Sequence, residues 1–219
     1  MIKKIELLKN SQDNRPISDK ERNGMIKRAT KEYGKFLTAL GFDWESDPQM
    51  TDTPYRVAKM YVNELFAGTH AEAPVIRDFE NSSGYSGMVF SGGIHINSVC
   101  AHHHAPFFGH AYIAYIPGKD GNVVGLSKLN RIADFFARRP QIQESLTQQI
   151  HDYINKVIPD NEGVAVYIEA RHMCTHGRGV KQNSIMATPV LSCSFLDLDR
   201  VKDEFYNLVN NIKQQQGKF

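Results

Sequence analysis

Apolar residues recur at helical intervals in the first third of the chain. Over residues 19–40 they step by three and four positions, which predicts an amphipathic helix that ends at Gly41. Asp52, followed two residues later by Pro54, predicts the start of a second helix that runs to Gly68. Residues 1–18 are polar and show no such period, so we expect them to form a flexible N-terminal arm.

The pattern changes near residue 87, which divides an N-terminal helical region at 19–86 from a domain at 87–219. This second part contains short runs of apolar, aromatic and β-branched residues bounded by glycines, which are typical of strands. We expect strands at 88–100, 109–117, 163–174 and 184–195, a hairpin turn at 117–121, and helices at 127–139, 141–157 and 199–213. This order predicts an α+β fold with a mostly antiparallel sheet.

Composition narrows the class of protein. A hydrophobic content of 41%, a charged content of 23% and a net charge of +2 describe an ordinary globular chain and give no sign of a nucleic-acid or membrane partner. The first residues lack the apolar core of a signal peptide. Three cysteines, two of them beside histidines, favour metal binding in a reducing, cytoplasmic compartment over disulfides. We expect the third, Cys193, to be a buried strand thiol.

The clearest chemical signal is a Cys-His-Cys set. Cys100 and His103 have the C-x2-H spacing of two ligands on one metal, and Cys174 is the obvious third. Thiolate and imidazole ligands together favour zinc. Structural zinc sites usually have four protein ligands, whereas catalytic sites have three and an open position. Three ligands therefore favour a catalytic zinc, although a structural zinc and a chance polar run stay open as alternatives.

Two further histidines lie beside this set. If the strand at 163–174 continues to its end, His172 and Cys174 project from the same face, because side chains alternate along a strand. His102 is next to His103 and points elsewhere. Histidine titrates near neutral pH, so His102 and His172 are candidates for proton transfer beside the metal.

Two polar groups on predicted helices complete the candidates. Ser127 is placed to cap a helix whose first turn carries Lys128 and Arg131, an arrangement that suits a phosphate. Arg178, just after Cys174, adds another cation. A second pair, Gln143 and Glu144, offers an amide and a carboxylate that can read a guanine edge. Taken alone, each group is more often a solvated helix face.

Together these segments resemble GTP cyclohydrolase I. The resemblance runs from about Asp52 to Phe205 and rests on specific blocks in the same order, among them CAHHHAPFFG, VVGLSKLNRI, ARRPQIQESLTQQI, GVAVYIEARHMC and RGVKQNS. It implies the tunnelling fold (T-fold), an antiparallel sheet with helices on one side and an N-terminal helical extension. In this family the sheets join into a barrel on oligomerisation, as a homodecamer of two pentamers with active sites between subunits.

The resemblance also implies roles for individual residues. It implies a Zn2+ ion bound by Cys100, His103 and Cys174. It implies an acid-base pair formed by His102 and His172. It implies that GTP is bound at the guanine by Gln143 and Glu144, and at the ribose and triphosphate by Ser127, Lys128, Arg131 and Arg178. The implied reaction opens the guanine imidazole ring, releases formate and forms 7,8-dihydroneopterin triphosphate, the first step of pterin, folate or deazaguanine biosynthesis.

One position departs from the family pattern. The family usually has Glu after the first zinc cysteine, where this chain has Ala101. A methyl group cannot accept a hydrogen bond, so one contact near the metal is missing. One alternative follows from this change: a cyclohydrolase with altered nucleotide preference, such as for dGTP. Two other classes stay open independently of it: a related T-fold enzyme acting on a pterin or deazapurine precursor, and a non-catalytic paralogue.

Overall fold

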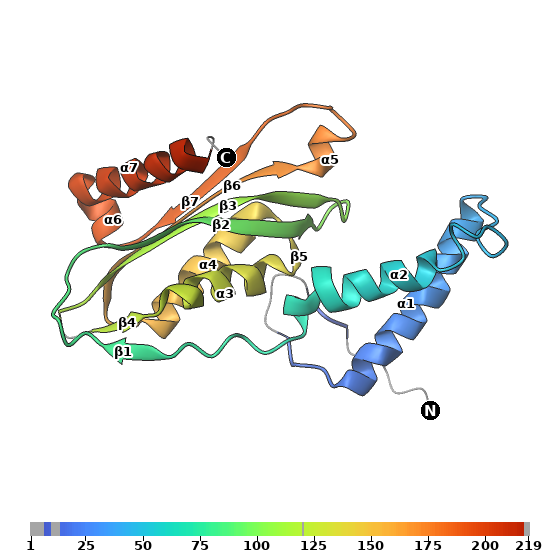
Figure 1. Cartoon of the computed structure of the whole chain (residues 1–219), viewed down its shortest axis with the longest axis horizontal. Helices are drawn as coiled ribbons and strands as arrows, with labels where there is room; N and C mark the ends of the chain where they lie inside the picture. Colours follow the sequence, from blue (N-terminus) through green and yellow to red (C-terminus); the bar gives the residue numbers. More distant parts are fainter. Residues whose placement is uncertain (1–6, 10–13, 120, 217–219) are drawn as a thin grey trace. The chain divides into compact units, whose positions relative to one another are not determined.

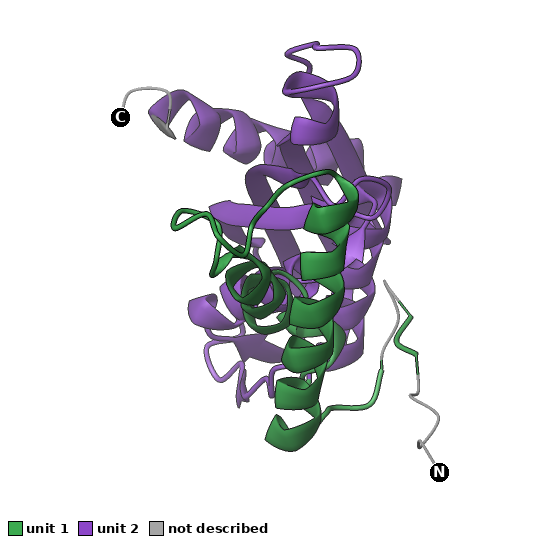
Figure 2. Ribbon diagram, turned by 90° about the vertical axis from the view of Figure 1, so that its right-hand side faces the viewer, with its two compact units in different colours: residues 1–72 green, residues 73–219 purple. Residues whose placement is uncertain are grey.

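The structure is a computed structural model that describes residues 7–9, 14–119 and 121–216. It divides into two compact units, Met1–Glu72 and Ala73–Phe219 (Figure 2). The predicted boundary near residue 86 therefore falls inside the second unit. Much of the predicted flexible arm, residues 1–6 and 10–13, lies outside the described residues. None of the helices in the described part of the chain is both long and apolar enough to cross a bilayer.

The first unit contains two main helices. The predicted helix is present as α1, Asp19–Ala39, and begins with a capping box in which Ser18 and Glu21 satisfy each other's backbone N–H groups. The second predicted helix is interrupted: α2, Thr53–Met60, is followed by a π-helical turn at Tyr61–Leu65 and a 3-10 turn at Ala67–Thr69. A helical period in the sequence does not distinguish these windings, because their repeats differ by only a fraction of a residue.

The second unit is built on a five-stranded sheet with the order β5-β2-β3-β6-β7 (Figure 1). The long strands pair antiparallel, as predicted, and the short β5 pairs parallel to the end of β2. The strands are β2, Val89–Cys100; β3, Pro106–Pro117; β5, Pro140–Gln141; β6, Asn161–His172; and β7, Met186–Leu191.

Helices cover both faces of this sheet, so the prediction of helices on one side is wrong. One face packs against α3, Leu126–Ala137, and α4, Gln143–Val157. The other packs against α7, Asp199–Gln216, and the short α6, Ser194–Asp197 (Figure 1). The alternation along β3 accounts for this, because Ile113 and Tyr115 join one core while Tyr112 and Ala114 join the other. A strand buried on both faces reads as a continuous apolar run.

Three local predictions fail in this unit. The segment after β3 does not form a hairpin, because β4, Asn122–Val124, pairs with β1, Asp78–Glu80, in a separate two-stranded sheet. The N-cap of α3 is Gly125, which places Ser127 inside the first turn. Cys193 is exposed and has a φ of +47° at the start of α6, so the chain has left the strand before it reaches this thiol.

Candidate metal centre and active site

The structure brings the three predicted metal ligands together. The ligand atoms of Cys100, His103 and Cys174 all lie within 4.8 Å of one another, and we call these three residues the metal group. Cys100 is buried, Cys174 is half-buried and His103 is exposed, so the group opens to solvent on the histidine side. This is the only such group of three or more His, Cys, Asp or Glu residues among those that the structure describes.

A tight loop between β2 and β3 fixes two of these ligands. The backbone N–H of Cys100 donates to the carbonyl of Ala105, and the N–H of His104 donates back to the carbonyl of Cys100, both at 2.9 Å. His104 adopts a φ of +51° to close the loop. The N–H of Ala101 donates to the carbonyl of Gln141 in β5 at 3.2 Å, a contact that the sequence did not suggest. The loop is thereby held both by hydrogen bonds across itself and by a hydrogen bond to β5.

The third ligand reaches the site by a different route from the one predicted. Strand β6 ends at His172, and Met173–His176 form a single helical turn, α5. His172 and Cys174 are therefore not alternate residues of one strand. The turn instead carries Cys174 toward the β2–β3 loop. Four residues are too few for a helical period to be visible in the sequence.

The donor set fits a soft or borderline dication. Burial, and to a smaller extent the neighbouring Cys100, raises the pKa of the Cys174 thiol. Two adjacent thiols resist forming two thiolates unless a cation offsets their charge. Two sulfurs and one imidazole nitrogen are the ligands that favour zinc over the oxygen-preferring Mg2+ and Ca2+.

Beside this group, His172 is held in a defined position. Its ring stacks on Phe107, its cross-strand neighbour, with centroids 4.6 Å apart and planes 8° apart. Its Nε2 lies 2.9 Å from Oε1 of Gln143 at the start of α4. Burial lowers the pKa of His172, and the nearby Glu144 carboxylate opposes that shift. The neutral ring is therefore favoured, with Glu144 close enough to act on it.

The Gln143 side chain itself is fully buried, which the sequence did not indicate. Its amide Nε2 is within 3.1 Å of the carbonyls of Ile168 and Met186 and of the Thr188 hydroxyl. Both amide hydrogens are thus used by the protein. The exposed Glu144 is the member of this pair whose side chain is free to meet a ligand.

His102 and Arg178 also lie on the metal side of the molecule. Nδ1 of His102 is 3.7 Å from Sγ of Cys100, and its ring is exposed. Arg178 is exposed in the turn after α5, where its charge acts on Cys174 and opposes the rise in the pKa of that thiol. The candidates for acid-base chemistry and one of the cations are therefore gathered around the metal group.

Three predicted residues are not gathered there. Ser127, Lys128 and Arg131 lie in the first turns of α3, which begins at the far end of the sheet. In this part of α3, Asn130 is in contact with Ser91 near the start of β2 (3.5 Å). The metal ligand at the other end of β2 is then about 30 Å away, at about 3.3 Å per residue. The start of α3 and the metal group therefore lie at opposite ends of β2.

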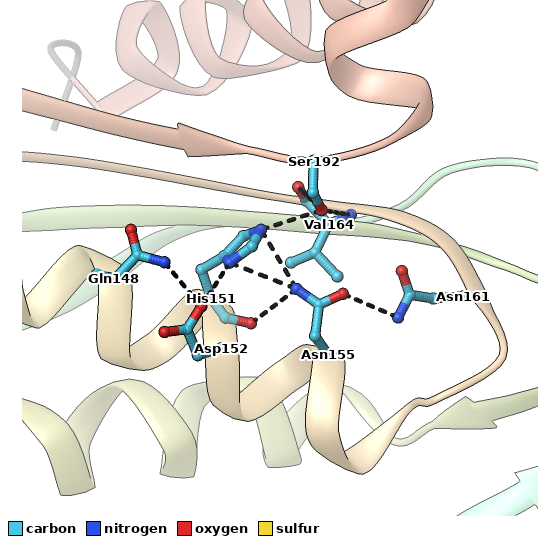
Figure 3. Close-up of polar contacts among 7 residues, drawn as sticks. All are labelled: Gln148, His151, Asp152, Asn155, Asn161, Val164 and Ser192. Carbon is cyan, nitrogen blue, oxygen red and sulfur yellow. Dashed lines mark hydrogen bonds and ion pairs between the residues drawn. The ribbon is translucent and has the colours of Figure 1, made fainter.

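Another histidine forms a polar network away from the metal (Figure 3). His151 in α4 lies between Asp152, whose carboxylate is 3.1 Å from Nδ1, and Ser192, whose hydroxyl is 3.0 Å from Nε2. The arrangement is that of a Ser-His-Asp relay, but His151 is 93% buried and Oγ of Ser192 also accepts from the N–H of Val164. The network fastens α4 to β6 and the residue after β7, and we assign it a structural role.

A separate pocket of about 410 Å³ lies in the first unit, between α1 and the π-helical turn. It is lined by Asp19, Arg22, Asn23, Val62, Asn63, Ala67, His70 and Ala71. No predicted site residue lines it. The candidate chemistry centres on the metal group, which lies at the β2–β3 loop and opens to solvent on the side of His103.

Comparisons with known proteins identify the family of this chain. The sequence pattern of the family described as GTP cyclohydrolase I matches residues 29–210. The chain is 42% identical over 183 residues to the GTP cyclohydrolase 1 of Corynebacterium glutamicum, covering 83% of this chain and 92% of that protein. It is 38% identical over 195 residues to that of Flavobacterium johnsoniae (88% and 84%), and 44% identical over 163 residues to that of Campylobacter jejuni (74% and 84%). The chain belongs to the GTP cyclohydrolase I family.

Proposed function

We propose that the chain catalyses the hydrolytic opening of the guanine imidazole ring of GTP, with loss of C8 as formate and rearrangement to 7,8-dihydroneopterin triphosphate. The observation that carries this proposal is the Cys100-His103-Cys174 group with a histidine oriented beside it. Three ligands leave one position open for water, as in catalytic zinc sites. When bound, zinc acts as a Lewis acid that lowers the pKa of a water molecule.

The residues around the metal group have two further roles, recognition of the base and transfer of protons. Glu144 is exposed and can accept hydrogen bonds from the N–H groups of guanine, which would set the ring against the metal. His172, with its neutral form favoured, can accept a proton, and His102 can donate one to the purine. We propose that His102 serves ring opening and that His172 serves the later rearrangement of the ribose.

We further propose that each active site is shared between two chains. Lys128 and Arg131 can bind a triphosphate at the N-terminus of α3, but they lie about 30 Å from the metal group of their own chain by the rise of β2. That distance is longer than a nucleoside triphosphate. A second chain that brings its α3 to this metal group would complete the site, with Arg178 adding a cation from the metal side.

The sheet has edges that fit such an assembly. Among the described residues, β7 pairs only with β6, and the outer side of β2 pairs with β5 only at Val99 and Cys100. Unpaired strand edges favour pairing with another chain. These edges support the proposed closure of the sheets into a barrel in a decamer of two pentamers. The cytoplasmic location and the effect of Ala101 on sugar choice stay predictions.

The proposed reaction is tested by incubating zinc-loaded protein with GTP. Dihydroneopterin is followed by its absorbance, and formate is assayed in parallel. We expect both products from the wild type. Cys174→Ala is expected to lose bound zinc and both products. His102→Ala and His172→Ala separate the steps: formate without pterin is expected only for the His172 variant. Equal loss of both products in both histidine variants would refute the division of roles.

A further inference from the structure

Gln143 occupies a place where its side chain orients a catalytic histidine from behind. It is the first residue of α4, fully buried, and its carbonyl oxygen Oε1 is 2.9 Å from Nε2 of His172. It belongs to a closed set of hydrogen bonds that involves Thr147 and Thr188, both of them buried. The set determines which way the amide faces.

The direction of the amide follows from its partners. Nε2 of Gln143 lies 3.0 Å from the carbonyl of Ile168 and 3.1 Å from that of Met186. Carbonyl oxygens only accept, so the NH2 group must face them, because a flipped amide would set oxygen against oxygen. Oε1 therefore faces His172. The orientation is fixed by the surrounding backbone and does not depend on the histidine.

The two threonines complete the set in one consistent direction. Gln143 donates to the hydroxyl of Thr188 at 3.0 Å, and the two threonine hydroxyls are 2.6 Å apart. The Thr147 hydroxyl donates to the backbone carbonyl of Gln143 at 2.8 Å. Because the Thr147 hydroxyl donates its only hydrogen to that carbonyl, the Thr188 hydroxyl donates to the Thr147 oxygen. Each hydroxyl thus has a defined role, and the amide cannot rotate without breaking several bonds.

The consequence concerns the proton on His172. An amide oxygen only accepts, so the bond at 2.9 Å requires a hydrogen on Nε2 of His172. In the neutral ring the lone pair is then on Nδ1. We propose that Gln143 is a positioning residue that holds His172 as the Nε2–H tautomer, with Nδ1 presented as the proton acceptor. Phe107, stacked on the ring, limits its rotation.

This proposal rests on the proposed catalytic role of His172, and it changes the predicted role of Gln143. Reading the base falls to Glu144, whose side chain is exposed. Loss of the group that orients a metal-bound histidine typically lowers metal affinity or activity by about 10- to 100-fold, and we expect a loss of activity of the same order for His172. An interaction that matters only as the reaction proceeds lowers kcat and leaves KM nearly unchanged.

The first test is made on the zinc-loaded wild type, with one variant used only to assign the signals. Nitrogen-15 NMR of histidine-labelled protein reports the protonated ring nitrogen, and the His172 signals are assigned by their loss in His172→Asn. We expect the Nε2–H form. An Nδ1–H form would overturn the proposal, whether or not GTP is turned over, so its failure is distinct from failure of the proposed reaction.

The second test is a double-mutant cycle on pterin formation from GTP. We expect Gln143→Met to lower kcat by about 10- to 100-fold with the KM for GTP changed by less than about threefold. In a His172→Ala background, which forms pterin only at a slow residual rate, the same substitution is expected to leave that residual rate unchanged, because its target is gone. An equal loss in both backgrounds would show a purely structural role. The control is Gln148→Met, on the exposed face of the same helix, which we expect to leave kcat unchanged.

Discussion

Mixing two inactive variants tests whether the active site is shared between chains. His172→Ala removes the proposed proton acceptor on the metal side of one chain. Lys128→Ala combined with Arg131→Ala removes the cations at the start of α3, about 30 Å away along the sheet. We expect each protein alone to form almost no dihydroneopterin from GTP, because each of its sites lacks either His172 or the two cations of α3.

The size of the recovery follows from the geometry. In a ring of identical head-to-tail contacts, each site has two halves from neighbouring chains. One chain supplies the metal half, which contains His172, and its neighbour supplies the cation half, which contains Lys128 and Arg131. When equal amounts of the two variants mix at random, half of the metal halves and half of the cation halves are intact. About one quarter of the sites should then have both intact halves. A site made within a single chain would give none.

The assay is dihydroneopterin formation by the mixed oligomer obtained by co-expression, with two affinity tags to confirm that it contains both variants. We expect a kcat per site of about one quarter of the wild-type value and an unchanged KM for GTP. Matching mixtures of wild type with each variant give the control values. Activity no higher than the sum of the separate variants, in an oligomer shown to be mixed, would refute the shared site.

Three further predictions concern stability. Phe205→Ala should lower the free energy of unfolding by about 3–5 kcal/mol in denaturant titrations, because this fully buried ring packs against three others. Gly109→Ala should lower it by about 1–3 kcal/mol or more, because the added Cβ would meet the Glu169 carbonyl at 1.9 Å. Burial lowers the pKa of His70, so the unfolded chain binds its proton more readily. Stability should therefore fall as the pH drops below about 6.5, by at most about 1.4 kcal/mol per pH unit, and His70→Gln should flatten this slope.

Each of these predictions has a contrary result. An exposed residue next to the same core, Leu196, is the control for Phe205, and equal losses for both alanine variants would contradict the packing argument. Full stability of the Gly109 variant would mean that β3 and β6 can move apart. An unchanged pH slope in the His70 variant would assign the acid sensitivity to other groups.

Much of the fold follows from residue patterns that report directly on packing. The helical steps in α1 and α4 and the apolar runs of β2 and β3 predicted these elements closely, because each buries a regular face. The patterns failed where backbone geometry departs from a repeat. Cys193 leaves its strand through a positive φ, and no property of its apolar neighbours signals that change.

In the candidate site, too, some features were predictable from local sequence and others depend on the fold. The spacing of Cys100 and His103 indicated a shared metal because both lie in one short loop. The approach of Cys174 depends on a four-residue helical turn, and the burial of Gln143 depends on contacts with β6 and β7 that are distant in the sequence. The separation of Lys128 from the metal is a property of the topology, which local patterns do not contain.

The most direct test of the central claim is the stoichiometry of products from GTP labelled with carbon-14 at C8 of guanine. Zinc-loaded wild-type protein is incubated with this substrate. The amounts of labelled formate and of dihydroneopterin triphosphate are measured in the same sample, together with any carbon-14 in the pterin. We expect one labelled formate for each pterin, and no label in the pterin. Absence of both products from protein that binds zinc and is assembled would contradict the account, and so would carbon-14 retained in the pterin.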